Sequence, residues 1–197
     1  DGTGVKYATI DAINGGIVKL TENQTIAGVK TFLSDILSNG LTIGRGNGNS
    51  LTNCAIGFAA LQTNTTGTSN TAVGNQALKD STSGNSNTAI GLQALFKNTT
   101  GLNNTAVGAQ ALRDNTTGLN NNGNGHLSLS NNTTGSNNSA HGTYSGAFIA
   151  DKATAATILN NSVMLGFNTS PLADNQTNQI VVGHNAIGLG SNTSVLG

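Results

Sequence analysis

The sequence predicts an all-β fold, a β-solenoid built from short coils of constant length, and three observations point to it. From Asn53 to about residue 153 the chain repeats itself every seventeen residues. Each copy has short apolar steps between Gly- and Asn-rich turns, which is typical of strands rather than helices. Charged residues make up only 8% of the chain and the net charge is zero. A fixed short period marks stacked units rather than a globular core.

Each well-formed copy begins with Asn and has Gly at its fifth position. The copies NCAIGFAALQTNTTGTS, NTAVGNQALKDSTSGNS, NTAIGLQALFKNTTGLN and NTAVGAQALRDNTTGLN begin at Asn53, Asn70, Asn87 and Asn104 and place Gly57, Gly74, Gly91 and Gly108 at the fifth position. Degraded copies begin at residues 121 and 138. The Asn could form an amide ladder along the stack or cap its own turn. The Gly indicates a positive φ or a tight contact between coils.

Within a copy, Ala at the third position and Ile or Val at the fourth form one apolar step, and Ala-Leu at the eighth and ninth forms another. We expect two short strands and two turns per coil. Two larger apolar side chains contribute about 1.5–3 kcal/mol each on burial, whereas ordering each backbone residue costs about 1–2 kcal/mol. Neighbouring coils and other chains must therefore supply the rest. Small Ala residues on the face opposite Val and Leu would let another backbone approach, and a closed threefold bundle satisfies every copy equally.

The period also sets the predicted boundaries. Residues 1–40 read as an N-terminal β-rich connector with strands over 16–20 and 25–32, and residues 41–142 as the seventeen-residue-repeat solenoid. An irregular insertion follows over 143–160, and further coils over 161–197. Insertions in solenoids often bind ligands, so Tyr144, Phe148 and the nearby His141 are the candidate receptor-binding residues. The alternative is an irregular coil with its aromatic side chains buried.

The composition argues against several functions. A neutral chain lacks the basic surface that nucleic acids require, and no stretch approaches the roughly 20 apolar residues of a membrane span. The eight acidic residues are scattered, so no catalytic carboxylate pair is apparent. His126 and His141 flank one turn, which makes a metal pair conceivable. We expect no catalytic residue, no metal ligand and no cofactor, and the chain is not expected to be an enzyme.

Several segments resemble known fibrous proteins. NTAVG, NTAIG, NSVMLG and QIVVGHNAIGLGSNTSVLG resemble the left-handed β-roll repeats in head domains of trimeric autotransporter adhesins, where a shorter repeat ending in A-[IV]-G stacks in three intertwined chains. The longer repeat, with LTENQTIAGVKTF and NGLTIGRGNGN, looks more like phage tail fibres and the fibres of phage-related contractile injection systems. There, an ending like SNTSVLG commonly leads into a chaperone that is cleaved off.

The resemblance implies an intertwined homotrimer that mediates attachment to a host cell-surface receptor, either a glycan or a protein. It also implies contact with tail or baseplate proteins through the N-terminal side. The location would be a virion tail or an extracellular surface. The alternative is the head domain of a bacterial surface adhesin.

The eleventh position generates a prediction about stability. It reads Asp80, Lys97 and Asp114 in three successive coils, and strands about 4.8 Å apart would stack these charges as an alternating column. Lys97→Asp is therefore expected to lower the melting temperature at low salt, although each exposed pair contributes only about 0–1 kcal/mol. An unchanged melting temperature would count against the column.

Overall fold

The computed structural model describes residues 36–38, 41–48 and 50–197, which belong to one compact unit. The strands expected over 16–20 and 25–32 lie outside the described residues. Within the described part the chain forms strands and turns, and no helix there is long and apolar enough to cross a membrane. The predicted β-solenoid of roughly seventeen-residue coils is confirmed.

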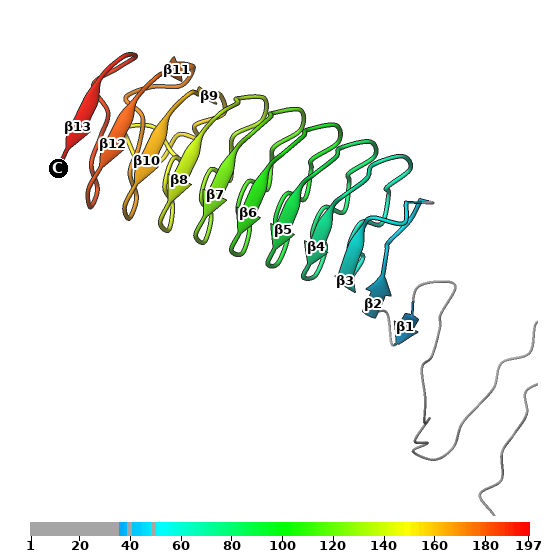
Figure 1. The fold of residues 1–197 in the computed structure, drawn as a ribbon. Helices are drawn as coiled ribbons and strands as arrows, with labels where there is room; N and C mark the ends of the chain where they lie inside the picture. Colours follow the sequence, from blue (N-terminus) through cyan, green and yellow to red (C-terminus); the bar gives the residue numbers. More distant parts are fainter. Residues whose placement is uncertain (1–35, 39–40, 49) are drawn as a thin grey trace, which may run out of the picture. The chain divides into compact units, whose positions relative to one another are not determined.

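Eleven of the described strands form one sheet along the stack (Figure 1). From β3 onward the sheet is parallel, and each coil contributes one strand to it. The described strands are β1 Ile36–Ser38, β2 Leu41–Gly44, β3 Cys54–Phe58, β4 Thr71–Val73, β5 Thr88–Ile90, β6 Thr105–Val107, β7 Asn122–Asn124, β8 Ser139–His141, β9 Leu159–Asn160, β10 Val163–Leu165, β11 Gln176–Thr177, β12 Ile180–Val182 and β13 Ser194–Leu196. The strands β9 and β11 pair separately.

The N-terminal edge of the parallel sheet is covered by antiparallel strands. β1 pairs with β2, and β2 pairs with β3, in antiparallel register. We expected residue 41 to start the repeating coils, but the parallel stack begins with the coil of β3, which starts at Asn53. Residues 41–44 instead occupy the hydrogen-bonding edge of β3, which would otherwise be open to pairing with another chain.

The coils differ in length only in one arc. The chain advances by seventeen positions between equivalent points of successive coils from β3 to β8, then by 24 to β10, by seventeen to β12 and by 14 to β13. In the regular coils, the backbone N–H of the thirteenth residue donates to the carbonyl of the thirteenth residue in the next coil. In the 24-residue coil, Thr157 takes this role, because its carbonyl accepts from the N–H of Thr133. In the 14-residue coil, Ile187 still pairs with Ser170 at the ninth position. Residues are therefore gained or lost between the ninth and sixteenth positions, outside the main sheet.

The core is a continuous column of small and large apolar residues. The third-position Ala residues and the ninth-position Leu residues of the regular coils have no exposed surface. Our expectation that Ala faces another chain is wrong: Ala72 and Ala77 lie beside Leu78 in the chain's own core. Side chains alternate along a strand, so the fourth position points outward, and Ile90 is 41% exposed.

These outward residues form what we call the outer apolar row. The row runs along one face of the main sheet and ends before β7 and β8, where Asn124 and His141 hold the same position. It consists of Ile43, Ile56, Val73, Ile90 and Val107.

The expectation of two strands in each coil is wrong for the coils over 53–137, because the second apolar step is a turn. Gln93 and Leu95 have φ values of 54° and 51°, and this left-handed geometry interrupts an extended chain. The step is held by a 3.0 Å hydrogen bond from Leu95 N to Ala111 O in the next coil. A left-handed Leu costs about 1–2 kcal/mol, which burial of its side chain offsets.

The fifth-position Gly is required for two reasons. Gly91 has a φ of 134°, which side-chain-bearing residues rarely adopt. A Cβ atom on Gly91 would also lie 2.5 Å from the carbonyl oxygen of Gly108 in the next coil. The positive φ and the tight coil contact expected from the sequence are thus both present.

The first-position Asn serves both roles that the sequence left open. Asn87 Nδ2 donates to Gly101 O of its own coil at 2.8 Å, and its Oδ1 accepts from Asn104 N of the next coil at 2.9 Å. Asn104 Nδ2 also lies 3.2 Å from Asn87 Oδ1. The same arrangement recurs from Asn70 to Asn121, so a column of buried amides joins the coils.

The charge column of the eleventh position is only half formed. Lys97 Nζ lies 2.9 Å from Asp114 Oδ1, and Arg113 also pairs with this carboxylate at 2.6 Å. Among the described residues no ion pair joins Lys97 to Asp80. Partial burial acts to raise the pKa of Asp114, but the hydrogen bonds from Arg113 and Lys97 outweigh it and hold that pKa below its ordinary value.

A second amide column, at the twelfth position, contains one defect. Asn115 Nδ2 donates to Asn98 Oδ1 at 2.8 Å. In the coil before Asn98 this position is Ser81, whose hydroxyl is too short to reach Asn64. The Oδ1 of Asn64 and the hydroxyl of Ser81 are consequently buried without a hydrogen-bond partner.

We predict that Ser81→Asn stabilises the protein, because its amide would donate to Asn64 Oδ1. Satisfying a buried acceptor contributes about 1–3 kcal/mol, measured as an increase in the free energy of unfolding by denaturant titration. The matched control is Asn115→Ser, which would leave Asn98 Oδ1 without its donor in the same way and should lower that free energy. A destabilised Ser81→Asn protein would contradict the assignment of the defect.

Candidate functional site

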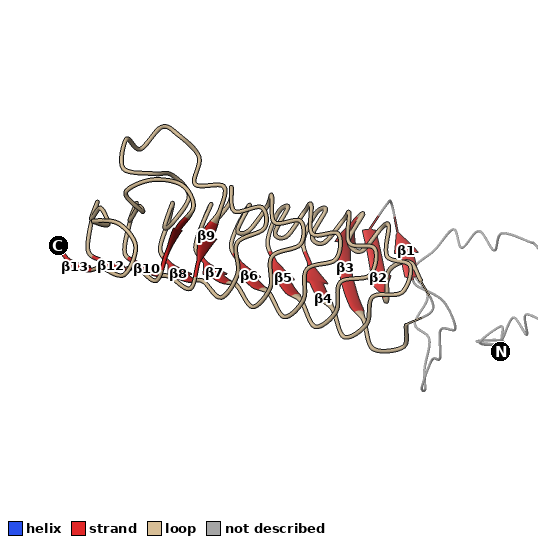
Figure 2. Cartoon of the chain, turned by 90° about the horizontal axis from the view of Figure 1, so that it is seen from above, coloured by secondary structure: helices blue, strands red, loops and turns tan. Residues whose placement is uncertain are grey.

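The 24-residue coil over 138–161 carries a short hairpin that the other coils lack. Phe148 forms an antiparallel bridge with Ala155, and Ile149 N donates to Thr154 O at 2.9 Å. The turn is closed by Asp151, whose carboxylate accepts hydrogen bonds from the hydroxyl and backbone N–H of Thr154 and from Ala153 N. These hydrogen bonds hold the pKa of Asp151 below its ordinary value, and the bond from the Thr154 hydroxyl has the largest effect. Figure 2 shows a loop longer than the others toward the C-terminal end of the stack.

One lysine attaches this hairpin to the next coil. Lys152 Nζ donates to the backbone oxygen of Asn168 and, at 2.8 Å, to Ser170 Oγ. Both acceptors belong to the coil that begins at Ser162. Partial burial lowers the pKa of Lys152. The hairpin is therefore held over the turn that follows β10.

Aromatic side chains from four successive coils gather beside the hairpin. The ring of Tyr144 makes an edge contact with His126, at 5.6 Å between centroids, and another with Phe167 at 6.4 Å. Tyr144 also lies 6.0 Å from Phe148 of the hairpin. Phe167 stacks on His184 at 5.2 Å with an angle of 15° between the ring planes. The two edge contacts and the stacked pair have geometries that aromatic rings prefer, whereas Tyr144 and Phe148 are tilted at 42° to each other.

The hairpin and the rings border an open surface hollow of about 340 Å³. Its lining residues are Tyr144, Phe148, Lys152, Phe167 and Asn168. Phe167 is 46% exposed, and Tyr144 and Phe148 are half-buried. The hollow thus presents apolar ring surface to solvent beside one ammonium group and one amide.

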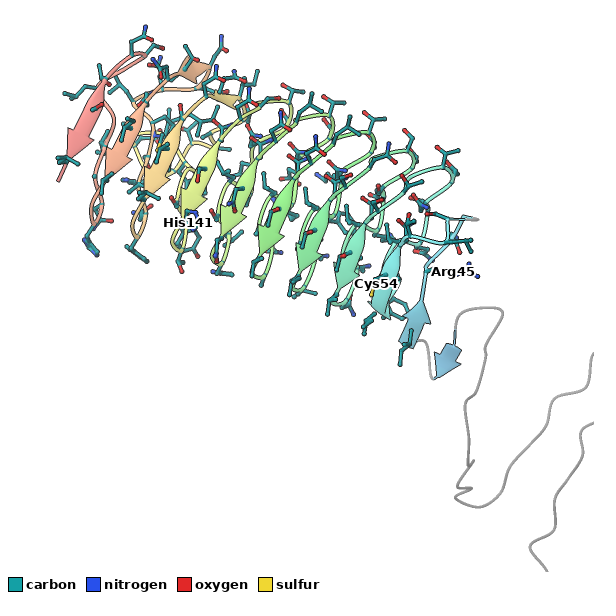
Figure 3. The ribbon with its side chains drawn as sticks, viewed as in Figure 1. Arg45, Cys54 and His141 are labelled. Atoms are coloured by element: carbon teal, nitrogen blue, oxygen red, sulfur yellow. The ribbon has the colours of Figure 1, made fainter. Side chains whose placement is uncertain are left out.

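The predicted site residues are only partly brought together. Tyr144 and Phe148 both line the hollow, and each is half-buried. His141 is elsewhere: it is exposed on the outer face of β8, along the same sheet as Cys54 of β3 (Figure 3). The pairing partner of His141 in β7 is Asn124, whereas His126 contacts Tyr144. The two histidines considered as a metal pair therefore point to different neighbours.

Three residues of the site were missed in the sequence analysis: Lys152, Phe167 and His184. A signal existed for two of them. Ser162 is the first residue of a new coil, because its N–H bonds to Asn138 Oδ1 as first-position residues do. Counting from Ser162 places Phe167 at the sixth position, and His184 has the same position in the following coil.

The repeat residues Asn53, Asn70, Asn87 and Asn104 hold the stack together and do not line the hollow. Within the described part of the chain, no three His, Cys, Asp or Glu side chains are grouped so that they could hold a metal ion. No protein-family model, curated protein or solved structure matches the chain.

Proposed function

We propose that this chain is a structural and receptor-binding segment of a homotrimeric tail fibre, of a phage or of a phage-like contractile injection system, that attaches to a host cell surface. The N-terminal side would face tail or baseplate proteins and the solenoid would face the host. The observation that carries the proposal is the repeating stack with an unpartnered apolar row on its outer face.

The outer apolar row supports self-association. Ile56 and Ile90 are 39% and 41% exposed, and the row extends over consecutive coils. Such contiguous apolar surface is typical of protein contacts. A threefold arrangement of intertwined left-handed coils would cover it in every copy equally.

The alternative is the head domain of a bacterial surface trimeric adhesin. One observation favours it: the coil from Gln179 to Asn192 has 14 residues and contains Ala186-Ile187-Gly188. This coil resembles the shorter repeat of those heads more than the seventeen-residue coils do.

The trimer generates a prediction about mass. The native chain is expected to sediment at three times its own mass of 19.7 kDa. Ile90→Asp should dissociate it, because a charge would be buried in the interface. Ile90 points outward, so the circular dichroism spectrum of the variant should remain native. The control is Thr100→Lys, which adds a charge in an exposed turn of the same coil and should leave the mass unchanged. A folded native chain that sediments with the mass of a single copy would contradict the trimer.

Attachment generates a second prediction. Fluorescently labelled chain should bind a subset of strains in a panel of bacteria, as measured by flow cytometry. Because three linked sites give avidity, Ile90→Asp should bind the same strains at least about tenfold more weakly. Equal binding of the native chain and this variant would contradict trimeric attachment, whereas Thr100→Lys should behave as the native chain does.

A further inference from the structure

The hollow beside the hairpin has the properties of a small-ligand site. Its volume of about 340 Å³ is at the lower end of the roughly 300–1,000 Å³ of ligand sites. Three rings, those of Tyr144, Phe148 and Phe167, line it at different inclinations. A ligand that fits must therefore present apolar surface to the rings.

The wall of the hollow also carries an uncompensated positive charge. Lys152 uses two of its three N–H donors on Asn168 O and Ser170 Oγ, which are neutral acceptors. Among the described residues Lys152 has no carboxylate partner, and the neighbouring Asp151 is bonded within its own turn. A half-buried ammonium group with a spare donor favours an anionic group nearby.

Amides complete the polar part of the site. Asn168 Nδ2 donates to Asn185 Oδ1 at 2.9 Å, which fixes the orientation of the Asn168 amide. Neither Asn168 Oδ1 nor the Tyr144 hydroxyl has a hydrogen-bond partner among the described residues. Tyr144 and Asn168 both line the hollow, and their free oxygen atoms are groups that can bond ligand hydroxyls.

We propose that this hollow binds an acidic saccharide, a sugar that carries a carboxylate. An apolar C–H face of the sugar packs on the rings of Tyr144 and Phe167, its carboxylate binds Lys152 Nζ, and its hydroxyls bond Asn168 Oδ1. Sugars combine an apolar face, a polar rim and small size. A peptide requires an elongated groove or a free strand edge, and this hollow is neither. The inference rests on the proposed attachment function and specifies its receptor as an acidic glycan.

The test compares two matched probes, 3′-sialyllactose and neutral lactose, together with a glucuronate-containing tetrasaccharide. Saturation-transfer NMR and titrations of the full chain should show that at least one acidic probe binds and that lactose binds at least about tenfold more weakly. Phe167→Ala should abolish binding. Phe58→Ala is the matched control, because Phe58 is also exposed at a sixth position but lies in the first coil. Equal binding of acidic and neutral probes, or of none, would overturn the proposal.

Two further variants separate charge from folding. Lys152→Met should weaken binding of the acidic probe at least about tenfold, and Lys152→Arg should retain it. If Lys152→Met and Lys152→Arg lose binding equally, the charge is not the determinant and the proposal fails.

Cell attachment is measured on the same variants. Strain binding that survives Phe167→Ala would leave the fibre function in place and place the receptor site elsewhere, which overturns this inference. Probe binding without strain binding would support the hollow and contradict the attachment function.

Discussion

Everything in this structure depends on hydrogen bonding from one coil to the next. A single coil buries one Leu and two Ala residues and has no stable fold alone. The backbone ladder supplies part of the coupling, and the buried amides supply the rest. Asn87 shows how: its Nδ2 closes its own coil while its Oδ1 accepts from the next. The same side chain thus fixes the shape of a coil and its register with its neighbour.

The period made the solenoid predictable, because equivalent residues at a constant interval must align when coils stack. The direction of side chains was less accessible. Ala at the third position suggested a surface for close approach, but the strand is only three residues long and its middle residue points inward. The eighth and ninth positions look like a strand in sequence. Left-handed conformations at Gln93 and Leu95 make that step a turn, and no composition rule anticipates a left-handed Leu.

The candidate site was harder to predict for a related reason. Tyr144 and Phe148 stood out because aromatic residues are scarce in this chain. Phe167 and Lys152 did not, because the seven additional residues of one coil hid the alignment of the coils on either side. The hollow exists only where the hairpin folds back, and that position is set by a long-range contact from Lys152 to Asn168 and Ser170.

The arc in which coil length varies has a practical consequence. Seven residues enter between the ninth and thirteenth positions of one coil and three are missing from another, yet β8, β10, β12 and β13 pair without a break. Strand pairing in the main sheet therefore does not depend on the length of that arc. Peptides grafted at the corresponding arc of the regular coils would be displayed in a row at the spacing of adjacent strands, about 4.8 Å per coil. The chain could therefore serve as a scaffold that arrays epitopes or ligands at a fixed spacing.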